Sequence, residues 1–291
     1  MIVLAGMSGA ASQGGIIMAL RVNTNVEALN VHNNLVISSN KVADSLKRLS
    51  SGRRINAAKD DASGLAVANN FRAKISSMRV ASQNATEAIS MLQTADGAFS
   101  KLTDILIRMR DLATQSASSQ TEERAKLDTE FQALKAEITR IGNSTRYGSL
   151  TLTSEDVIYT FQVGAGNDPF VDSLTLAFKA VTAGALGLSA NSAVSTMASA
   201  SAAMSAIDAA LSSMNVYMAN VGAYQNRLQH TIENLAIAIE NFSASESAIR
   251  DVDMAYEMTQ FTKNQILQQT GIAMLSQANQ APQQLMQLIN G

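Results

Sequence analysis

The segment from Met204 to Ile249 reads MSAIDAALSSMNVYMANVGAYQNRLQHTIENLAIAIENFSASESAI, and it decides the fold of this chain. Apolar residues recur in it at alternating steps of three and four, the heptad spacing of helices that pack along a seam. Polar residues occupy the seam only at Gln225 and Glu246, and a single polar seam residue often fixes the register of paired helices. At about 1.5 Å per residue, the segment predicts a helix of roughly 70 Å. A helix of that length must bury its seam against partner helices.

Two shorter segments carry the same spacing and would supply those partners. The first seam consists of Ala88, Leu92, Ala95, Phe99, Leu102, Leu106, Met109 and Ala113. The second consists of Leu127, Phe131, Leu134, Ile138 and Ile141. The chain has only two prolines, Pro169 and Pro282, so long uninterrupted helices are possible. We therefore predict a mainly α fold with a small β region, in which an elongated coiled-coil helical bundle carries terminal helices and a short β-hairpin segment.

The middle of the chain has a different pattern. Residues Val157 to Val163 alternate β-branched and aromatic side chains with others, which predicts a strand. The turn-forming sequence GAGNDP follows at 164–169, and Ser173 to Phe178 is a plausible return strand. We predict a small β-hairpin region over 151–189 at the outer end of a rod-like bundle, which is formed by 61–150 and 190–250.

Both ends of the chain are expected to be helical, with thinner apolar seams flanked by Gln and Asn. The candidate assembly residues of these terminal helices are Leu35, Val42, Leu46, Leu49, Leu267, Met274, Leu285 and Leu288. Ordering a residue costs about 1–2 kcal/mol of backbone entropy, and a thin seam offsets little of that cost. We expect 18–60 and 251–291 to form one inner domain that is disordered or loosely helical in the monomer and orders against other subunits.

The charge distribution agrees with paired ends. Residues Met18 to Val80 contain ten Lys and Arg against four Asp and Glu, a balance of +6. Residues Thr231 to Gly291 contain two against six, a balance of −4. The net charge of −2 gives no electrostatic basis for nucleic-acid binding. No apolar run approaches the ~20 residues that span a bilayer, so membrane insertion is not expected.

We find no grouping of residues that predicts catalysis, a cofactor or a metal. Cysteine is absent, which excludes disulfides and thiolate ligands. His230 and Glu233 are neighbours on a helix face and could share a metal, but a surface pair is the simpler reading. Asp156, Asp168 and Asp172 near the predicted hairpin could bind a divalent cation, or could be ordinary turn carboxylates. The chain is therefore not expected to be an enzyme.

Two blocks near opposite ends of the chain carry a resemblance to a known family. Arg48 to Ala68 reads RLSSGRRINAAKDDASGLAVA, and Gln265 to Gln284 reads QILQQTGIAMLSQANQAPQQ. These blocks resemble the N-terminal and C-terminal conserved blocks of bacterial flagellins, and the resemblance extends from about Met18 to the end. It implies a secreted, extracellular structural subunit that forms a homopolymer, the flagellar filament used for motility, with the terminal helices as its innermost tube. It also implies an export apparatus, an export chaperone and a filament cap as partners.

The same resemblance singles out two groups of side chains. Arg53, Arg54, Lys59, Asp60 and Asp61 form a mixed-charge cluster. It is either a solvated loop or a connector whose ion pairs set the angle between inner and outer domains or reach a neighbouring subunit.

The second group lies in LIRMRDLATQ, from Leu106 to Gln115, which is similar to the flagellin segment recognised by the vertebrate innate flagellin receptor. The matching positions are Arg108, Leu112 and, on the next helix, Glu130. The alternative reading of this surface is packing between adjacent subunits.

Several alternatives remain open at this level. A hook–filament junction protein would share the terminal blocks, although the fuller match at both ends favours the main filament subunit. A cell-surface binding protein or adhesin could use a flagellin scaffold and meet its ligand at 151–196. A cytoplasmic signalling coiled coil would share the heptads but not the two terminal blocks. Residues 1–17 are read as a misassigned start or an N-terminal extension.

Overall fold

The computed structural model describes residues 24–118, 123–188 and 192–290, without the side chains at 281, 282 and 284–290. The predicted extension at 1–17 lies outside the described residues. The helices are α1 (Val26–Ser51), α2 (Ala62–Ser116), α3 (Arg124–Ser144), α4 (Met197–Arg250) and α5 (Met254–Asn290). The strands are β1 (Arg146–Tyr147), β2 (Leu150–Thr151), β3 (Val157–Gln162) and β4 (Ser173–Phe178). The mainly α fold with a small β region is confirmed.

The chain divides into two compact units. One contains Met1–Leu65 and Ile249–Gly291, and the other contains Ala66–Ala248. We call them the terminal unit and the bundle unit. None of the described helices is both long and apolar enough to cross a membrane.

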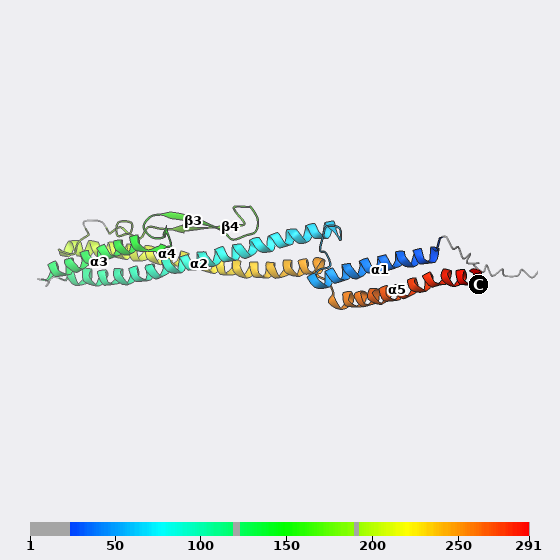
Figure 1. Ribbon diagram of the computed structural model, residues 1–291. Helices are drawn as coiled ribbons and strands as arrows, with labels where there is room; N and C mark the ends of the chain where they lie inside the picture. The colour runs from blue at the N-terminus through cyan, green and yellow to red at the C-terminus, as the bar shows by residue number, and fades with distance from the viewer. Residues whose placement is uncertain (1–23, 119–122, 189–191, 291) are drawn as a thin grey trace, which may run out of the picture. The chain divides into compact units, whose positions relative to one another are not determined.

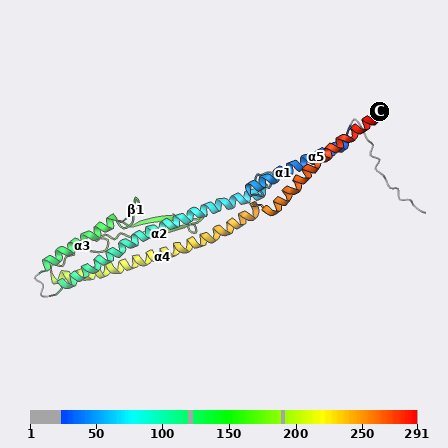
Figure 2. The same cartoon turned by 60° about the horizontal axis from the view of Figure 1, so that its bottom comes forward.

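The bundle unit is built on α2 and α4, which lie side by side and antiparallel (Figures 1 and 2). Phe71 stacks on Phe242 near one end of the pair, with ring centroids 5.5 Å apart. Arg110 donates to Asp208 near the other end, at 2.7 Å. The predicted α2 seam is fully buried from Ala88 to Ala113, and α3 contributes Phe131 and Ile138 to the same core. The heptad pattern therefore identified the residues that hold this unit together.

The predicted hairpin is present as the antiparallel pair β3–β4, in which Val157 lies opposite Phe178 and Gln162 opposite Ser173. Alternate residues of β4, namely Leu174, Leu176 and Phe178, are buried against the helices. The period-two alternation of a strand explains why one face of the hairpin covers the bundle while the other meets solvent. A second, shorter antiparallel pair joins β1 to β2.

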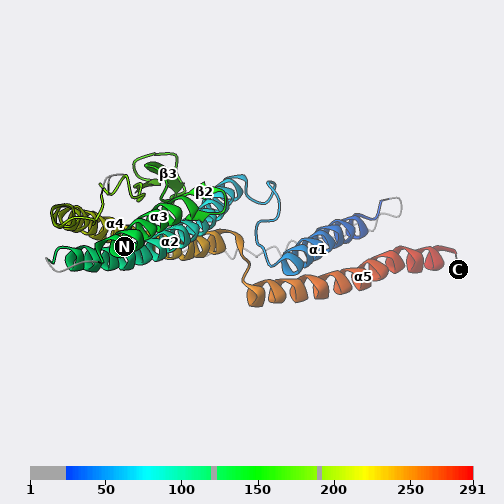
Figure 3. The same cartoon turned by 90° about the vertical axis from the view of Figure 1, so that its left-hand side faces the viewer.

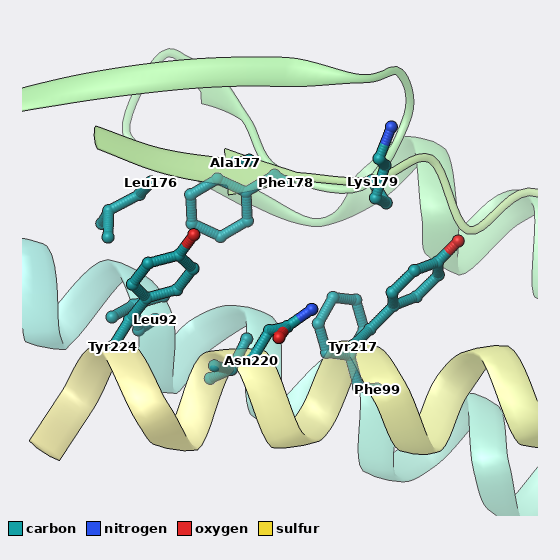
Figure 4. Close-up of a pocket in the computed structure, with 10 residues that line it drawn as sticks. Leu92, Phe99, Leu176, Ala177, Phe178, Lys179, Tyr217, Asn220 and Tyr224 are labelled. Atoms are coloured by element: carbon teal, nitrogen blue, oxygen red, sulfur yellow. The ribbon is translucent and has the colours of Figure 1, made fainter.

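A cavity of about 30 Å³ lies where β4 meets α2 and α4. Figure 4 shows Phe178 of β4 beside Tyr224 of α4, and Tyr217 of α4 beside Phe99 of α2. Such a volume holds about one water molecule. This gap, lined by aromatic and aliphatic side chains, is too small for an organic ligand.

The three hairpin aspartates have separate tasks. Asp168 Oδ1 accepts from the Phe170 amide at 2.9 Å, and Asp172 Oδ2 accepts from the Asp168 amide at 3.1 Å. Asp156 accepts from Lys179 and from the Ala180 amide. The Lys179 ammonium, followed by the Ala180 amide, lowers the pKa of Asp156 below its ordinary value of 3.8. These carboxylates act as turn and strand-end acceptors in the described structure.

Candidate assembly interface

The terminal unit is an antiparallel pair formed by α1 and α5 (Figure 3). The side chain of Asn25 begins α1 by accepting from the Ala28 amide at 3.0 Å. Its amide group also donates to the Ala278 carbonyl of α5 at 2.8 Å. At the other end of the pair, Arg48 lies 3.6 Å from the Glu257 carboxylate. The first and last parts of the chain therefore contact each other along most of α1.

Local sequence signals set the C-terminal end of α1 and the N-terminal end of α5. Gly52 follows α1 with φ of 68°, a left-handed conformation that glycine adopts at little cost. Asp253 begins α5, since its Oδ1 accepts from the Ala255 and Tyr256 amides at 2.9 and 3.0 Å. Side-chain acceptors at this position satisfy amides that have no partner within the helix.

The seam between α1 and α5 mixes small and polar residues with a few larger apolar ones. On α1 the inward positions are Ala28, Val31, Leu35, Ser38, Val42, Ser45 and Leu49. On α5 they are Glu257, Phe261, Asn264, Gln268, Gly271, Leu275 and Ala278. Leu35 packs over Gly271, where an added Cβ would lie in ordinary van der Waals contact with its Cδ1, at 3.4 Å. The predicted residues Leu35, Val42 and Leu49 lie on this seam, where they are half-buried.

Most large apolar side chains of the two helices point away from the seam. On α1 the exposed set is Val26, Leu29, Val36, Ile37 and Leu46. On α5 it is Met254, Tyr256, Met258, Ile266, Leu267, Ile272 and Met274. Among the predicted assembly residues, Leu46, Leu267 and Met274 are 56%, 47% and 54% exposed. Leu285 and Leu288 belong to α5, but their side chains lie outside the described residues.

These outward residues are spread around each helix. Leu29 and Ile37 on α1, like Leu267 and Ile272 on α5, occupy different heptad positions from one another. A helix that is apolar on several sides is normally buried, and large exposed apolar surfaces mark interaction sites. The terminal unit thus offers apolar surface on more than one side for protein partners.

The predicted charged connector lies between α1 and α2, where it joins the chain to the α4–α5 junction. Arg53 forms an isolated antiparallel bridge with Asp251. The Arg54 amide donates to the Arg250 carbonyl, and the Arg54 guanidinium donates to the Ile249 carbonyl, both at 2.7 Å. The two arginines therefore connect main chains that are about 200 residues apart in sequence.

The other connector charges stabilise the loop itself. Lys59 lies 3.6 Å from Asp44 of α1, with both side chains exposed. The Ala57 and Asn56 amides donate to Asp60 and lower its pKa below the ordinary value of 3.8. Asp61 accepts from the Gly64 amide at 2.9 Å and so begins α2.

The five charged residues do not pair with one another; they contact Asp44 and backbone groups. Their role in setting an angle between domains stays a prediction.

The two ends of the chain, which pair as helices α1 and α5, also match two family models in sequence. The model of the bacterial flagellin N-terminal helical region matches residues 22–155, and that of the C-terminal helical region matches residues 204–289. This chain belongs to the flagellin family.

Relatives within the flagellin family match along nearly their whole length. The chain is 42% identical over 271 residues to the flagellin of Halalkalibacterium halodurans, an alignment that covers 92% of this chain and 99% of that one. It is 35% identical over 306 residues to the flagellin of Bacillus subtilis, with 93% and 100% covered. A solved structure described as a flagellar hook-associated protein from Vibrio parahaemolyticus is similar in fold. Its TM-score is 0.55 at 14% identity, over 66% of this chain and 100% of that one.

Of the three residues predicted to form a surface on α2 and α3, only Arg108 and Glu130 are exposed. Arg108 and Glu130 form a two-contact ion pair, in which Nε and Nη2 lie 2.9 and 2.7 Å from the same carboxylate oxygen. Leu112 is 1% exposed and belongs to the bundle core. Its assignment to the surface was wrong, because it lies three residues after Met109 on the inward seam.

The sequence reasoning missed the polar side chains buried between α1 and α5, chiefly Glu257, Asn264 and Ser45. The sequence contained a signal for Asn264, because Gly271 and Ala278 lie seven and fourteen residues after it and therefore on the same helix face. Small residues at this spacing indicate a face on which a second helix can pack. The large apolar residues Leu267 and Met274 share a different heptad position, and they concealed this seam.

Proposed function

We propose that this chain is the structural subunit that polymerises into the bacterial flagellar filament and thereby serves motility. The observation that carries the proposal is the inverted distribution of side chains in the terminal unit. The α1–α5 seam mixes small and polar residues with a few larger apolar ones, whereas most of the large apolar residues face outward on several sides. A surface of this kind fits a protein whose terminal helices are buried by neighbouring copies.

The mechanism of growth follows from the geometry of such contacts. Each subunit presents one apolar patch to a different patch on its neighbour, and heterologous contacts that do not close produce a helical assembly. Burial of apolar surface contributes about 25 cal/mol per Å², which offsets the entropy of ordering the terminal helices. In this proposal, 18–60 and 251–291 are loosely ordered in the monomer and become fixed on addition to the growing tip.

The remaining segments have complementary roles in the proposed filament. Residues 61–150 and 190–250 form a rod-like bundle, and 151–189 lies at its outer end. The absence of room for a large variable outer domain gives a comparatively smooth filament surface. In this proposal the Arg53–Asp61 connector sets the angle between the inner and outer domains or reaches a neighbouring subunit.

Further partners belong to the same proposal by family resemblance. The subunit is exported from the cell by the flagellar export apparatus with the help of an export chaperone, and it adds beneath a filament cap. The exposed Arg108–Glu130 pair is a candidate contact for the vertebrate innate flagellin receptor or for an adjacent subunit. Leu112 is excluded from that contact by its burial.

Negative-stain electron microscopy of the full chain with short filament seeds tests the proposal. We expect long filaments of uniform diameter from the wild-type chain. Leu267→Asp places a charge in the outward apolar set and should stop elongation, whereas Gln269→Asp, on an exposed polar position of the same helix, should permit it. Persistent monomers of the wild-type chain would contradict the proposal and favour a surface binding protein on a flagellin scaffold.

A further inference from the structure

Three polar side chains are buried where α1 crosses the first half of α5. Ser45, Glu257 and Asn264 are 5%, 4% and 8% exposed. The Arg48 guanidinium lies 3.6 Å from the Glu257 carboxylate. The Ser45 and Asn264 side chains make no hydrogen bond to any other described residue. All four residues line one groove of about 400 Å³.

This polar cluster, Ser45 with Arg48, Glu257 and Asn264, weakens the pair that contains it. Removing the Glu257 carboxylate from bulk water carries a desolvation penalty, which a single ion pair seldom repays, and the Ser45 and Asn264 side chains add little apolar burial to the seam. Well-packed apolar residues in place of buried polar groups are often neutral or stabilising. The bundle unit demonstrates the alternative within the same chain, since its α2 seam from Leu92 to Met109 is apolar and fully buried.

What the cluster supplies is register. At the other end of the same seam, Leu35 fits over Gly271, and Asn25 donates to the Ala278 carbonyl. Because the helices are antiparallel, a slip of one heptad would bring Leu35 opposite Asn264 or Ala278 and would separate Arg48 from Glu257. Polar seam residues are known to fix register in paired helices at a cost in stability. The exposed apolar residues outside the seam favour association of helices in many registers and do not select one of them.

We infer that the polar cluster is a specificity device for assembly: it permits only one register of α1 on α5 and keeps the isolated pair too weak to order without a neighbouring subunit. This inference rests on the proposed function, because its benefit appears only during polymerisation. It assigns Ser45, Glu257 and Asn264 to preventing premature and misregistered assembly. Adhesion between subunits is left to the outward apolar residues.

The test compares Asn264→Leu with Gln265→Leu in the full chain. Both substitutions add the same side chain to α5, but Asn264 is buried in the seam and Gln265 is exposed. Without seeds, Asn264→Leu should nucleate about tenfold faster than wild type, a ratio that corresponds to about 1.4 kcal/mol. Its products should vary in diameter, whereas Gln265→Leu should stay within about twofold of wild type. Ser45→Ala, which adds no volume, should shift nucleation in the same direction by a smaller factor.

Hydrogen exchange of the monomers separates this inference from the proposed function. Asn264→Leu should slow exchange in α1 and α5 before any assembly. The separate variant Asn264→Gln, which keeps a polar amide, should exchange at the wild-type rates. Unchanged exchange in both Asn264→Leu and Ser45→Ala, or equal nucleation by Asn264→Leu and Gln265→Leu, would overturn the inference even if wild type extends seeds. Failure of wild type to extend seeds would instead count against the proposed function.

Discussion

This flagellin has two long helix pairs, α2–α4 in the bundle unit and α1–α5 in the terminal unit. Both pairs have heptad spacing, but their large apolar residues point in opposite directions. In the first pair the large apolar residues face inward, as Phe99, Leu102 and Leu106 do. In the second pair most of them face outward, as Leu46, Leu267 and Met274 do, and the buried residues of the seam are the polar Ser45, Glu257 and Asn264. The comparison teaches that heptad spacing alone predicts a helix, and that the direction of its apolar residues indicates whether the partner is inside or outside the chain.

The largest expected effect comes from removing one of the two pairs. Deletion of all residues after Ala255 removes nearly all of α5, and with it half of the terminal unit. We expect elongation of seeds to be abolished, because the outward apolar surface is lost. The bundle unit should keep its helical circular dichroism and its melting transition, since its core contains no residue of α5. Loss of that transition would show that the two pairs do not fold separately.

The same substitution in each pair should have different consequences. Leu106 is completely buried in the bundle core, so Leu106→Ala should lower the free energy of unfolding by about 2–5 kcal/mol. Leu267→Ala should change it by less than about 0.5 kcal/mol, because that side chain is half-exposed. Denaturant titration measures both values. Seeded elongation should show the reverse order, with the stronger defect in Leu267→Ala, and a stability loss at Leu267 comparable to that at Leu106 would contradict the comparison.

A smaller effect is expected from the surface ion pair of the bundle unit. Arg108 and Glu130 are 56% and 43% exposed at the side chain, so their coupling should be about 0.2–1 kcal/mol. A double-mutant cycle with Arg108→Ala and Glu130→Ala measures it by chemical denaturation. The coupling should decrease in high salt, because ions screen exposed charges. A coupling well above 1 kcal/mol that resists salt would mean that this surface is less solvated than the structure shows.

The smallest expected effect is the acid dependence of the hairpin. Asp156 has a folded pKa below its ordinary value of 3.8, because Lys179 and the Ala180 amide donate to its carboxylate. Its contribution is therefore fully present above the unfolded pKa and is lost as pH falls through the folded pKa. The melting temperatures of wild type and Asp156→Asn should differ at about pH 6 and converge toward about pH 3. A difference that grew with acidification would contradict this assignment.

Much of the bundle unit was predictable from sequence. The apolar residues of α2 and α4 recur at alternating steps of three and four, and no proline interrupts them. This pattern is typical of long helices that bury one face. The strand pair was predictable because β-branched and aromatic residues flank a turn rich in glycine, aspartate and asparagine. The family resemblance placed Leu112 at the surface, but three residues after Met109 the helical spacing returns it to the inward seam.

The terminal unit was less predictable, for a physical reason. Apolar residues at several heptad positions of α5 allow more than one seam, and the true one contains Glu257, Asn264 and Gly271. A polar or glycine seam gives a weak sequence signal, since hydrophobic periodicity reports only where the large apolar residues lie. The contacts of Arg53 and Arg54 with the backbone at 249–251 were also beyond sequence reasoning, because they join distant segments.

The central claim is that the bundle unit is stable by itself whereas α1 and α5 depend on neighbouring subunits. Hydrogen–deuterium exchange measured by mass spectrometry on the monomer and on the assembled filament tests it most directly. We predict that amides of α2 and α4 are protected in both states, and that amides of α1 and α5 exchange rapidly in the monomer and become protected only in the filament. Equal protection of α1 and α5 in the two states would contradict the account.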